Sequence, residues 1–322
     1  MIRAAQYTPF RSRGVGYAAT PDQLSEADPR KRLRQGYTEF EGVDDFYRIF
    51  PELPAAFAGK DVLDYGCGYG GKTVAYARLA RFAAGIEPVQ THIELSEAFR
   101  RHRGVENAEF RICTQAGIPY PDDSFDIVVS HDVIEHVDDP ASALAEIHRV
   151  LRPGGIAYLA FPPYDGMLSH HLDYVSTLPG LHLLFSPETL VDAANREIDR
   201  LGLAHSRQPA PRKTWDGGRA ALPTLNGLTS AQFDALSTAI FDEVQVERRP
   251  VAKYRGGFAG IVRDALLALG RVSRGVDEFA TVSLHCRLRK AGADSLVPPA
   301  AETALDARAP TRSRRASLSE AN

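Results

Sequence analysis

Short apolar runs alternate with helical segments between residues 61 and 161, and this alternation limits the possible folds more than any other feature of the chain. The runs are DVLDYG (61–66), FAAGIE (82–87), AEFRIC (108–113), FDIVVSH (125–131) and GIAYLAF (155–161). Because parallel neighbours need a long return path, and right-handed crossovers place helices on both faces, the pattern predicts a doubly wound α/β fold with a mostly parallel sheet. Its binding site is expected where the loops after the first, second and fourth strands meet.

The alternation of strands and helices stops after the fifth run and resumes near the C-terminus. A helix at 229–240, capped by Thr229 or Ser230, precedes a strand at about 241–249, and a last strand at 279–290 is expected to pair with it in antiparallel fashion. The sequence predicts five segments: a lead-in with short helices (1–58), a Rossmann-like core (59–164), an inserted lid above the pocket (165–226), a helix and strands that complete the sheet (227–291), and a disordered tail (292–322).

Composition and charge argue against several classes of protein. A net charge of −3 gives no electrostatic reason to expect nucleic acid or an anionic membrane as the partner. The first residues, MIRAAQYTPFRSRG, lack an apolar segment after their arginines, and no run reaches the length of about 18 apolar residues that suggests a membrane span. Three scattered cysteines fit neither a disulfide framework nor a zinc pair. We therefore expect a cytoplasmic enzyme with reduced thiols.

The turn after the first strand, GCGYGGKT (66–73), fits three ligand-binding patterns at once. It satisfies the phosphate loop G-x-x-x-x-G-K-[ST], the dinucleotide turn G-x-G-x-x-G and, counted from Asp64, the pattern D-x-G-x-G-x-G. Asp64 argues against the first two, because a carboxylate at the strand end repels a phosphate. Glu87 ends the second strand about 20 residues further on, as expected for a carboxylate that binds ribose hydroxyls. A cationic nucleoside agrees with both acids.

Four motifs in order resemble the class I S-adenosylmethionine-dependent methyltransferases, in particular the small-molecule enzymes of the ubiquinone/menaquinone methyltransferase type. They are VLDYGCGYGG (62–71), GIEP (85–88), IPYPDDSFDIVVSHDVIEHVDDP (118–140) and LAEIHRVLRPGGIAYLAFPP (144–163). The resemblance implies S-adenosylmethionine as the cofactor and methyl transfer to a small-molecule acceptor. In one departure, this chain has Thr114 where the family usually has a carboxylate after the third strand. A hydroxyl there can still accept a hydrogen bond from the adenine amine.

The resemblance assigns a role in donor binding to residues at the ends of the strands. The glycine backbone would let the methionine portion approach closely, since a Cβ would obstruct it. Asp64 would bind the ammonium and Glu87 would bind the ribose hydroxyls. The remaining residues would line the adenine and the methyl group. The predicted cofactor-binding residues are Asp64, Gly66, Gly68, Gly70, Glu87, Pro88, Thr114, Gln115, Ala116 and His131.

Histidines near the expected acceptor site are the candidates for a catalytic general base. His131 ends the fourth strand, and His170 and His171 lie in the predicted lid, whose closure would bring an imidazole to an acceptor hydroxyl. On this ground O-methylation is slightly favoured over C- or N-methylation. Adjacent histidines point apart, and no further ligands follow at a recognised spacing, so no metal site is predicted. His136 is interpreted as a residue that fixes its loop.

Two other functions remain open at this point. A nicotinamide-dependent oxidoreductase would use the same glycine turn, although no recognisable catalytic pair follows the fourth strand. A protein that binds S-adenosylmethionine without catalysis would need the donor site alone. Binding of S-adenosylmethionine compared with NAD tests the first alternative, and methyl incorporation tests the second. The sequence predicts neither the oligomeric state nor the identity of the acceptor.

Overall fold

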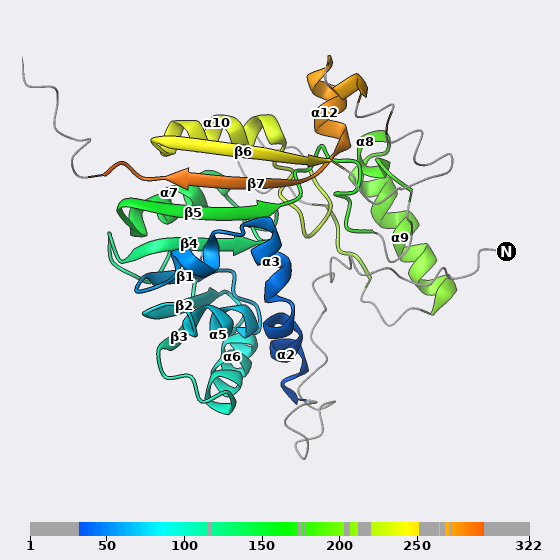
Figure 1. The fold of residues 1–322 in the computed structure, drawn as a ribbon. Helices are drawn as coiled ribbons and strands as arrows, with labels where there is room; N and C mark the ends of the chain where they lie inside the picture. Colours follow the sequence, from blue (N-terminus) through cyan, green and yellow to red (C-terminus); the bar gives the residue numbers. More distant parts are fainter. Residues whose placement is uncertain are drawn as a thin grey trace, which may run out of the picture.

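The computed structural model describes residues 32–114, 117–172, 176, 178–202, 207–211, 220–250, 264, 268–270 and 272–292. Its strands are β1 (Asp61–Tyr65), β2 (Phe82–Glu87), β3 (Ala108–Ile112), β4 (Phe125–His131), β5 (Leu151–Phe161), β6 (Glu243–Pro250) and β7 (Thr281–Arg289). Within these residues they form a seven-stranded sheet in the order β3-β2-β1-β4-β5-β7-β6 (Figure 1). Strands β1 to β5 pair in parallel, whereas β7 is antiparallel to β5 and β6. The predicted doubly wound, mostly parallel sheet with an antiparallel C-terminal strand is confirmed.

Strand β5 begins earlier than the sequence pattern predicts. We expected it to start at residue 155, because the segment LRPGG is typical of a turn. The structure starts the strand at Leu151, which pairs with Phe125, and the register shifts before the regular pairing with β4 continues. Gly154, within this irregular part, has a φ of 80°. A bulge therefore accommodates the proline and glycines inside the strand.

Helices cover both faces of the sheet. They are α2 (Arg34–Glu41), α3 (Val43–Ile49), α4 (Leu53–Ala56), α5 (Gly71–Ala77), α6 (Gln90–His102), α7 (Pro140–Val150), α8 (Leu181–Leu184), α9 (Pro187–Leu201), α10 (Ser230–Ile240) and α12 (Arg274–Ala280). On one face α7 and α10 bury Leu144 and Phe233 against the strands. On the other face α3 and α5 bury Phe46 and Tyr76. Each such side chain contributes roughly 1.5–3 kcal/mol by leaving water.

Three helices begin directly after a side chain that caps them. Asp139 precedes α7 and Ser186 precedes α9, and each accepts hydrogen bonds from backbone N–H groups of the first turn. Thr229 precedes α10 and forms a capping box with Gln232. These side chains satisfy N–H groups that have no partner within the helix. Of the two residues predicted as caps, Thr229 and Ser230, the structure uses Thr229.

The described part of the predicted lid lies beyond the carboxyl ends of β4 and β5 (Figure 1). It contains α8 and α9 and has a small apolar core, formed with the end of the preceding segment: Tyr164, Leu172, Leu190, Val191, Ala194, Ala221, Leu222 and Leu225. The boundaries of the five predicted segments stay a prediction. Residues 1–31 and 293–322, on which most of the lead-in and nearly all of the tail fall, lie outside the described residues.

A second connection, between β6 and β7, also reaches this end of the sheet through α12 (Figure 1). The N–H of Met167 donates to the carbonyl of Phe279 over 2.9 Å. A Cβ at Gly180 would lie 3.1 Å from the Phe279 ring, so α12 packs closely against the lid. The sequence pattern did not predict α12, because a seven-residue helix offers little periodicity to detect.

Candidate active site

The glycine turn lies between the end of β1 and the start of α5. Gly66, Gly68 and Gly70 have φ values of 79°, 56° and 73°, a backbone region that other residues enter only with strain. A Cβ at Gly66 would lie 2.5 Å from Cγ2 of Val133, in the loop after β4. The turn is therefore packed tightly against that loop, and these positions require glycine. Their part in binding the methionine portion stays a prediction.

The carboxylate of Glu39, from α2, lies directly on this turn. It accepts hydrogen bonds from the backbone N–H groups of Tyr69 (3.1 Å) and Gly71 (3.0 Å). Burial raises the pKa of Glu39 to about 7, although these two hydrogen bonds act in the opposite direction. Glu39 was not among the residues predicted from the sequence. An acid 30 residues before Tyr69 carries no local signal, because only tertiary packing brings it to the glycines.

Asp64 is buried at the end of β1, where it accepts a hydrogen bond from Thr73 Oγ1 over 2.6 Å. Burial raises the pKa of Asp64 to about 6, while this hydrogen bond and the charge of Lys72 lower it. Lys72 Nζ lies 2.7 Å from Nδ1 of His131. In a phosphate loop the lysine and the threonine bind phosphate and magnesium. Here both contact side chains of the protein itself, which argues against a phosphate loop.

Glu87 ends β2 as predicted, and its side chain is nearly buried. Its Oε1 lies 3.2 Å from Nδ1 of His92, and the ring of Tyr69 packs on His92 with 4.3 Å between centroids. These two rings, from α6 and the glycine turn, were not predicted. The two rings lie beside the carboxylate of Glu87. This arrangement suits a ribose joined to a flat base.

The predicted adenine-binding residues follow β2 and β3. Glu87 is paired with Ile112, so the carboxyl ends of these strands lie side by side. Pro88 directly follows β2 and Thr114 lies two residues after β3, and both are exposed. Gln115 and Ala116 lie outside the described residues. The structure thus brings Pro88 and Thr114 to the same edge as Glu87, and their contacts with adenine stay a prediction.

His131 ends β4 and is enclosed by neighbouring side chains. Its ring lies 5.0 Å from the ring of Phe46, measured between centroids. Because Lys72 donates to Nδ1, the ring proton resides on Nε2, 3.6 Å from Oδ2 of Asp132. Burial lowers the pKa of His131 to about 4, and the charge of Lys72 acts in the same direction. At pH 7 this imidazole is neutral, and its remaining nitrogen is a hydrogen-bond donor.

The loop after β4 is fixed by hydrogen bonds to the lid. His136 Nδ1 donates to the carbonyl of Thr224 over 2.5 Å. The buried amide of Asn226 donates to the carbonyls of Ile134 (2.7 Å) and Val137 (3.0 Å). The interpretation of His136 as a residue that fixes the loop agrees with its contact. Asn226 was missed, because its partners are backbone carbonyls about 90 residues earlier in the chain and leave no local pattern.

The two predicted lid histidines point in different directions. His170 accepts the N–H of Leu172 at Nδ1 (3.0 Å), and its Nε2 donates to the carbonyl of Leu178 (3.1 Å). His171 instead packs on His136, with ring centroids 5.2 Å apart. Burial lowers the pKa of His171 to about 3, and His136 adds to the effect. The structure therefore brings His171 to the loop after β4 and keeps His170 within the lid.

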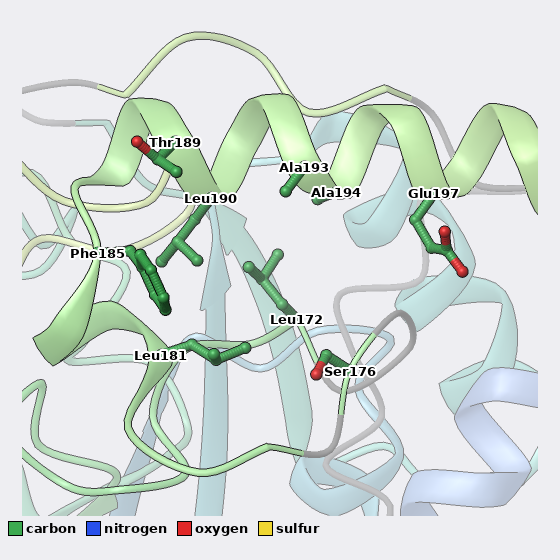
Figure 2. A pocket seen from close by; sticks show the side chains of 9 residues that line it. All are labelled: Leu172, Ser176, Leu181, Phe185, Thr189, Leu190, Ala193, Ala194 and Glu197. Carbon is green, nitrogen blue, oxygen red and sulfur yellow. The ribbon is translucent and has the colours of Figure 1, made fainter. Parts of the chain in front are cut away.

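An apolar cavity of about 300 Å³ lies between α9 and the segment around α8. Figure 2 shows side chains of α9 pointing toward Leu172, Leu181 and Phe185 on the opposite side. The lining residues are Leu172, Ser176, Leu181, Phe185, Thr189, Leu190, Ala193, Ala194 and Glu197. The apolar run at 178–185 was interpreted as a wall of the acceptor site or as the attachment of the lid. Leu181 and Phe185 of this run do line a cavity, together with Leu172, the residue that follows His171.

Three further observations on the described residues concern metal ligands, membrane-spanning helices and the cysteine of the glycine turn. No group of three or more His, Cys, Asp or Glu side chains among them could hold a metal ion. None of the helices they form combines the length and the apolar character needed to cross a membrane. Cys67, in the glycine turn, is buried, and burial raises the pKa of its thiol well above the usual range. This cysteine is therefore a small packing residue, since a reactive thiol needs a lowered pKa.

Comparison with known proteins decides the family. Residues 63–159 match the sequence model described as "Methyltransferase domain". A "Probable S-adenosylmethionine-dependent methyltransferase" of Mycolicibacterium smegmatis is 30% identical over 200 residues, which cover 62% of this chain and 68% of that protein. The chain belongs to the S-adenosylmethionine-dependent methyltransferase family. The predicted family is thereby confirmed, and with it S-adenosylmethionine as the family's methyl donor.

Other methyltransferases match shorter parts of the chain. The uncharacterized methyltransferase YcgJ of Bacillus subtilis is 31% identical over 119 residues, or 36% of this chain and 47% of YcgJ. Its crystal structure has a TM-score of 0.44 and 19% identity, and the match covers 76% of this chain and 99% of that chain. A ubiquinone biosynthesis O-methyltransferase of Rhizobium johnstonii is 29% identical over 128 residues, or 40% of this chain and 51% of the relative. In sequence, this methyltransferase therefore spans about half the length of these two relatives.

The charges around the glycine turn of this methyltransferase fit a cationic donor. Two carboxylates lie there with one cation, Lys72: Asp64 is buried and Glu39 is half-buried. Burial disfavours the charged form of both acids, and an ammonium or sulfonium placed beside them would offset that cost. Glu87 adds the carboxylate suited to ribose hydroxyls. A phosphate-bearing nucleotide would instead meet acids on both sides of the turn.

Proposed function

We propose that this methyltransferase transfers a methyl group from S-adenosylmethionine to a small-molecule acceptor that carries an apolar group and an oxygen nucleophile. The observation that carries this proposal is the apolar cavity between α8 and α9, which is lined in part by Leu172, the residue that follows His171. The printed name of the Rhizobium relative, an O-methyltransferase, supports oxygen over carbon or nitrogen. The net charge of −3 supports a small molecule over nucleic acid. A cytoplasmic location stays a prediction.

On the donor side the chain would supply alignment and exclusion of water. S-adenosylmethionine presents a methyl carbon that its sulfonium already activates, so the reaction needs in-line approach of a nucleophile more than covalent catalysis. Glu87 would hold the ribose hydroxyls. Asp64, oriented by its hydrogen bond from Thr73, would face the ammonium. The neutral imidazole of His131 would shape the space beside the methyl group.

On the acceptor side, none of the predicted catalytic histidines has the properties of a strong base. His131 and His171 have pKa values lowered by burial, and both nitrogens of His170 already form hydrogen bonds. A general base works best with a pKa near the operating pH. The acceptor is therefore one whose hydroxyl ionises readily, such as an acidic phenol. The catalytic roles of the three histidines stay a prediction, and the following substitution tests that of His171.

Replacing His171 by Gln is expected to lower kcat toward an acidic phenol such as an alkyl 4-hydroxybenzoate by less than about tenfold, because a neutral imidazole there contributes packing and a hydrogen bond. Loss of a true general base costs about 100-fold or more. The measurement is kcat between pH 5 and 9 for the wild type and the variant. A 100-fold loss, or an ionisation in the wild-type profile that disappears in the variant, would instead identify His171 as the base.

Replacing Ala193 by Trp is expected to fill the cavity and to lower kcat/KM for a long-chain alkyl 4-hydroxybenzoate at least about tenfold, since several methylene groups lose their apolar contacts. Affinity for S-adenosylhomocysteine should stay unchanged. Asp192→Trp is the matched control, because Asp192 is exposed on the same helix and does not line the cavity. Equal activity of both variants toward long and short alkyl chains would place the acceptor elsewhere.

The proposed function is tested by calorimetry followed by an assay of methyl incorporation. S-adenosylmethionine and S-adenosylhomocysteine are titrated with NAD and ATP as comparators, and a series of alkyl 4-hydroxybenzoates of increasing chain length is then offered with labelled donor. Binding of both sulfur nucleosides with labelled product supports the proposal. Preference for NAD would favour a nicotinamide-dependent oxidoreductase. Donor binding without labelled product would favour a protein that binds the donor without catalysis.

A further inference from the structure

We propose that Glu39 makes the glycine turn selective for a cationic donor. Its carboxylate accepts hydrogen bonds from the two backbone N–H groups that a phosphate would otherwise bind, and its negative charge favours the donor's ammonium. This inference rests on the proposed function for the identity of the donor. It assigns a donor-positioning role to α2, a helix that none of the glycine-turn patterns includes.

The first observation is the geometry of the carboxylate on the turn. Oε1 accepts the N–H of Tyr69 and Oε2 accepts the N–H of Gly71, so one carboxylate bridges the turn and the start of α5. A Cβ at Gly68 would lie only 2.8 Å from Oε1. Glycine turns that bind phosphates use backbone amides in this position. In this chain those amides already have an anionic partner from the protein.

The second observation is that α2 is held in place by close backbone packing. A Cβ at Gly71 would lie 2.1 Å from the carbonyl oxygen of Gly36, so the two helices touch where both residues lack a side chain. A Cβ at Gly36 would lie 2.8 Å from the ring of Phe99. The helix that carries Glu39 is therefore wedged between α5 and α6, and the carboxylate is presented at a fixed position.

The third observation is the balance of charge around Glu39. The titratable groups that face it are Lys72 and Tyr76 from α5, Asp64 from β1, and Cys67 and Tyr69 from the turn. Lys72 is the one cation of this set, and it also contacts His131. When Asp64 and Glu39 are both ionised, the set carries an excess negative charge. An ammonium or sulfonium compensates this charge, whereas a pyrophosphate adds to it.

The pH dependence of donor binding follows from the same balance. Burial raises the pKa of Glu39 to about 7 and that of Asp64 to about 6, so both acids are partly protonated just below neutral pH. A cationic donor binds the ionised forms and therefore displaces protons. Affinity is expected to rise between pH 5.5 and 8 and to level off above it. Proton release on binding should be largest near pH 6.5.

The test compares wild type, Glu39→Gln and Glu39→Ala, with Glu41→Gln as the matched control, because Glu41 is exposed on the same helix. S-adenosylhomocysteine and inorganic pyrophosphate are titrated by calorimetry between pH 5.5 and 8, and thermal unfolding is followed at the same pH values. At pH 8 we expect Glu39→Gln to bind S-adenosylhomocysteine at least about tenfold more weakly. We also expect a flatter pH profile, tighter binding of pyrophosphate than in wild type, and a Tm no lower than that of wild type.

The outcomes separate this inference from the proposed function. Wild-type binding of S-adenosylhomocysteine with an unchanged affinity and pH profile in Glu39→Gln would overturn the role of Glu39 alone. A Tm that falls in proportion to the lost affinity would reduce Glu39 to a structural residue and overturn the inference as well. No binding of S-adenosylhomocysteine by the wild type would overturn the proposed donor itself. The Glu41→Gln control should match wild type in every measurement.

Discussion

Replacing Glu87 by Ala is expected to weaken the binding of S-adenosylhomocysteine by about 100-fold. The carboxylate is nearly buried at the end of β2, where two ribose hydroxyls would donate to it. A hydrogen bond to a charged group contributes about 1.5–3 kcal/mol, so losing two such bonds removes about 3 kcal/mol or more. At 25 °C about 1.4 kcal/mol corresponds to a tenfold change in affinity. Calorimetric titration of the variant measures the loss directly.

Two further variants show whether the loss at Glu87 belongs to the ribose contact. Glu87→Gln keeps the size of the side chain and one acceptor, so we expect a smaller loss, near tenfold. Glu94→Ala removes an exposed carboxylate from α6 and should leave affinity unchanged. If Glu87→Ala bound S-adenosylhomocysteine as tightly as wild type, this residue would be a strand-end charge paired with His92 and nothing more.

Replacing Gly71 by Ala is expected to lower the free energy of unfolding by about 3 kcal/mol, at the upper end of the usual cost of overpacking. The added Cβ would lie 2.1 Å from the carbonyl oxygen of Gly36 and 2.6 Å from Cβ of Glu39. The nearest of these atoms belongs to the backbone of α2, so a side-chain rotation does not remove the clash. The variant must move α2 away from α5, and the hydrogen bonds of Glu39 to the turn are lost with it. Denaturant unfolding measures the stability.

The same variant should also bind S-adenosylhomocysteine more weakly, because it separates Glu39 from the turn. Gly275→Ala is the matched control. Gly275 is exposed in α12, its Cβ would meet nothing within 4 Å, and alanine is the better helix former, so stability should be unchanged or slightly higher. Wild-type stability in Gly71→Ala would mean that α2 and α5 can separate without loss, and that the position of Glu39 depends on other contacts.

Local sequence signals determined the central sheet and the glycine turn. The strands β2 and β4 occupy the residues predicted for them, because buried parallel strands are continuous apolar runs with clear ends. The cap at Thr229 was predictable, because its partner Gln232 lies three residues away. The glycines at 66, 68 and 70 all adopt positive φ, a property that single residues signal in sequence. Each of these features depends on neighbours along the chain.

The tertiary structure alone decided which side chains surround the glycine turn and whether those side chains are ionised. Glu39 reaches the turn from α2, and Asn226 fixes the loop after β4 from the far end of the lid. The sequence named His131, His170 and His171 as bases, but whether an imidazole can take a proton depends on burial and on its partners. Such properties arise from groups distant in sequence that packing brings together, because desolvation and hydrogen bonding act through space and leave no periodic trace along the chain.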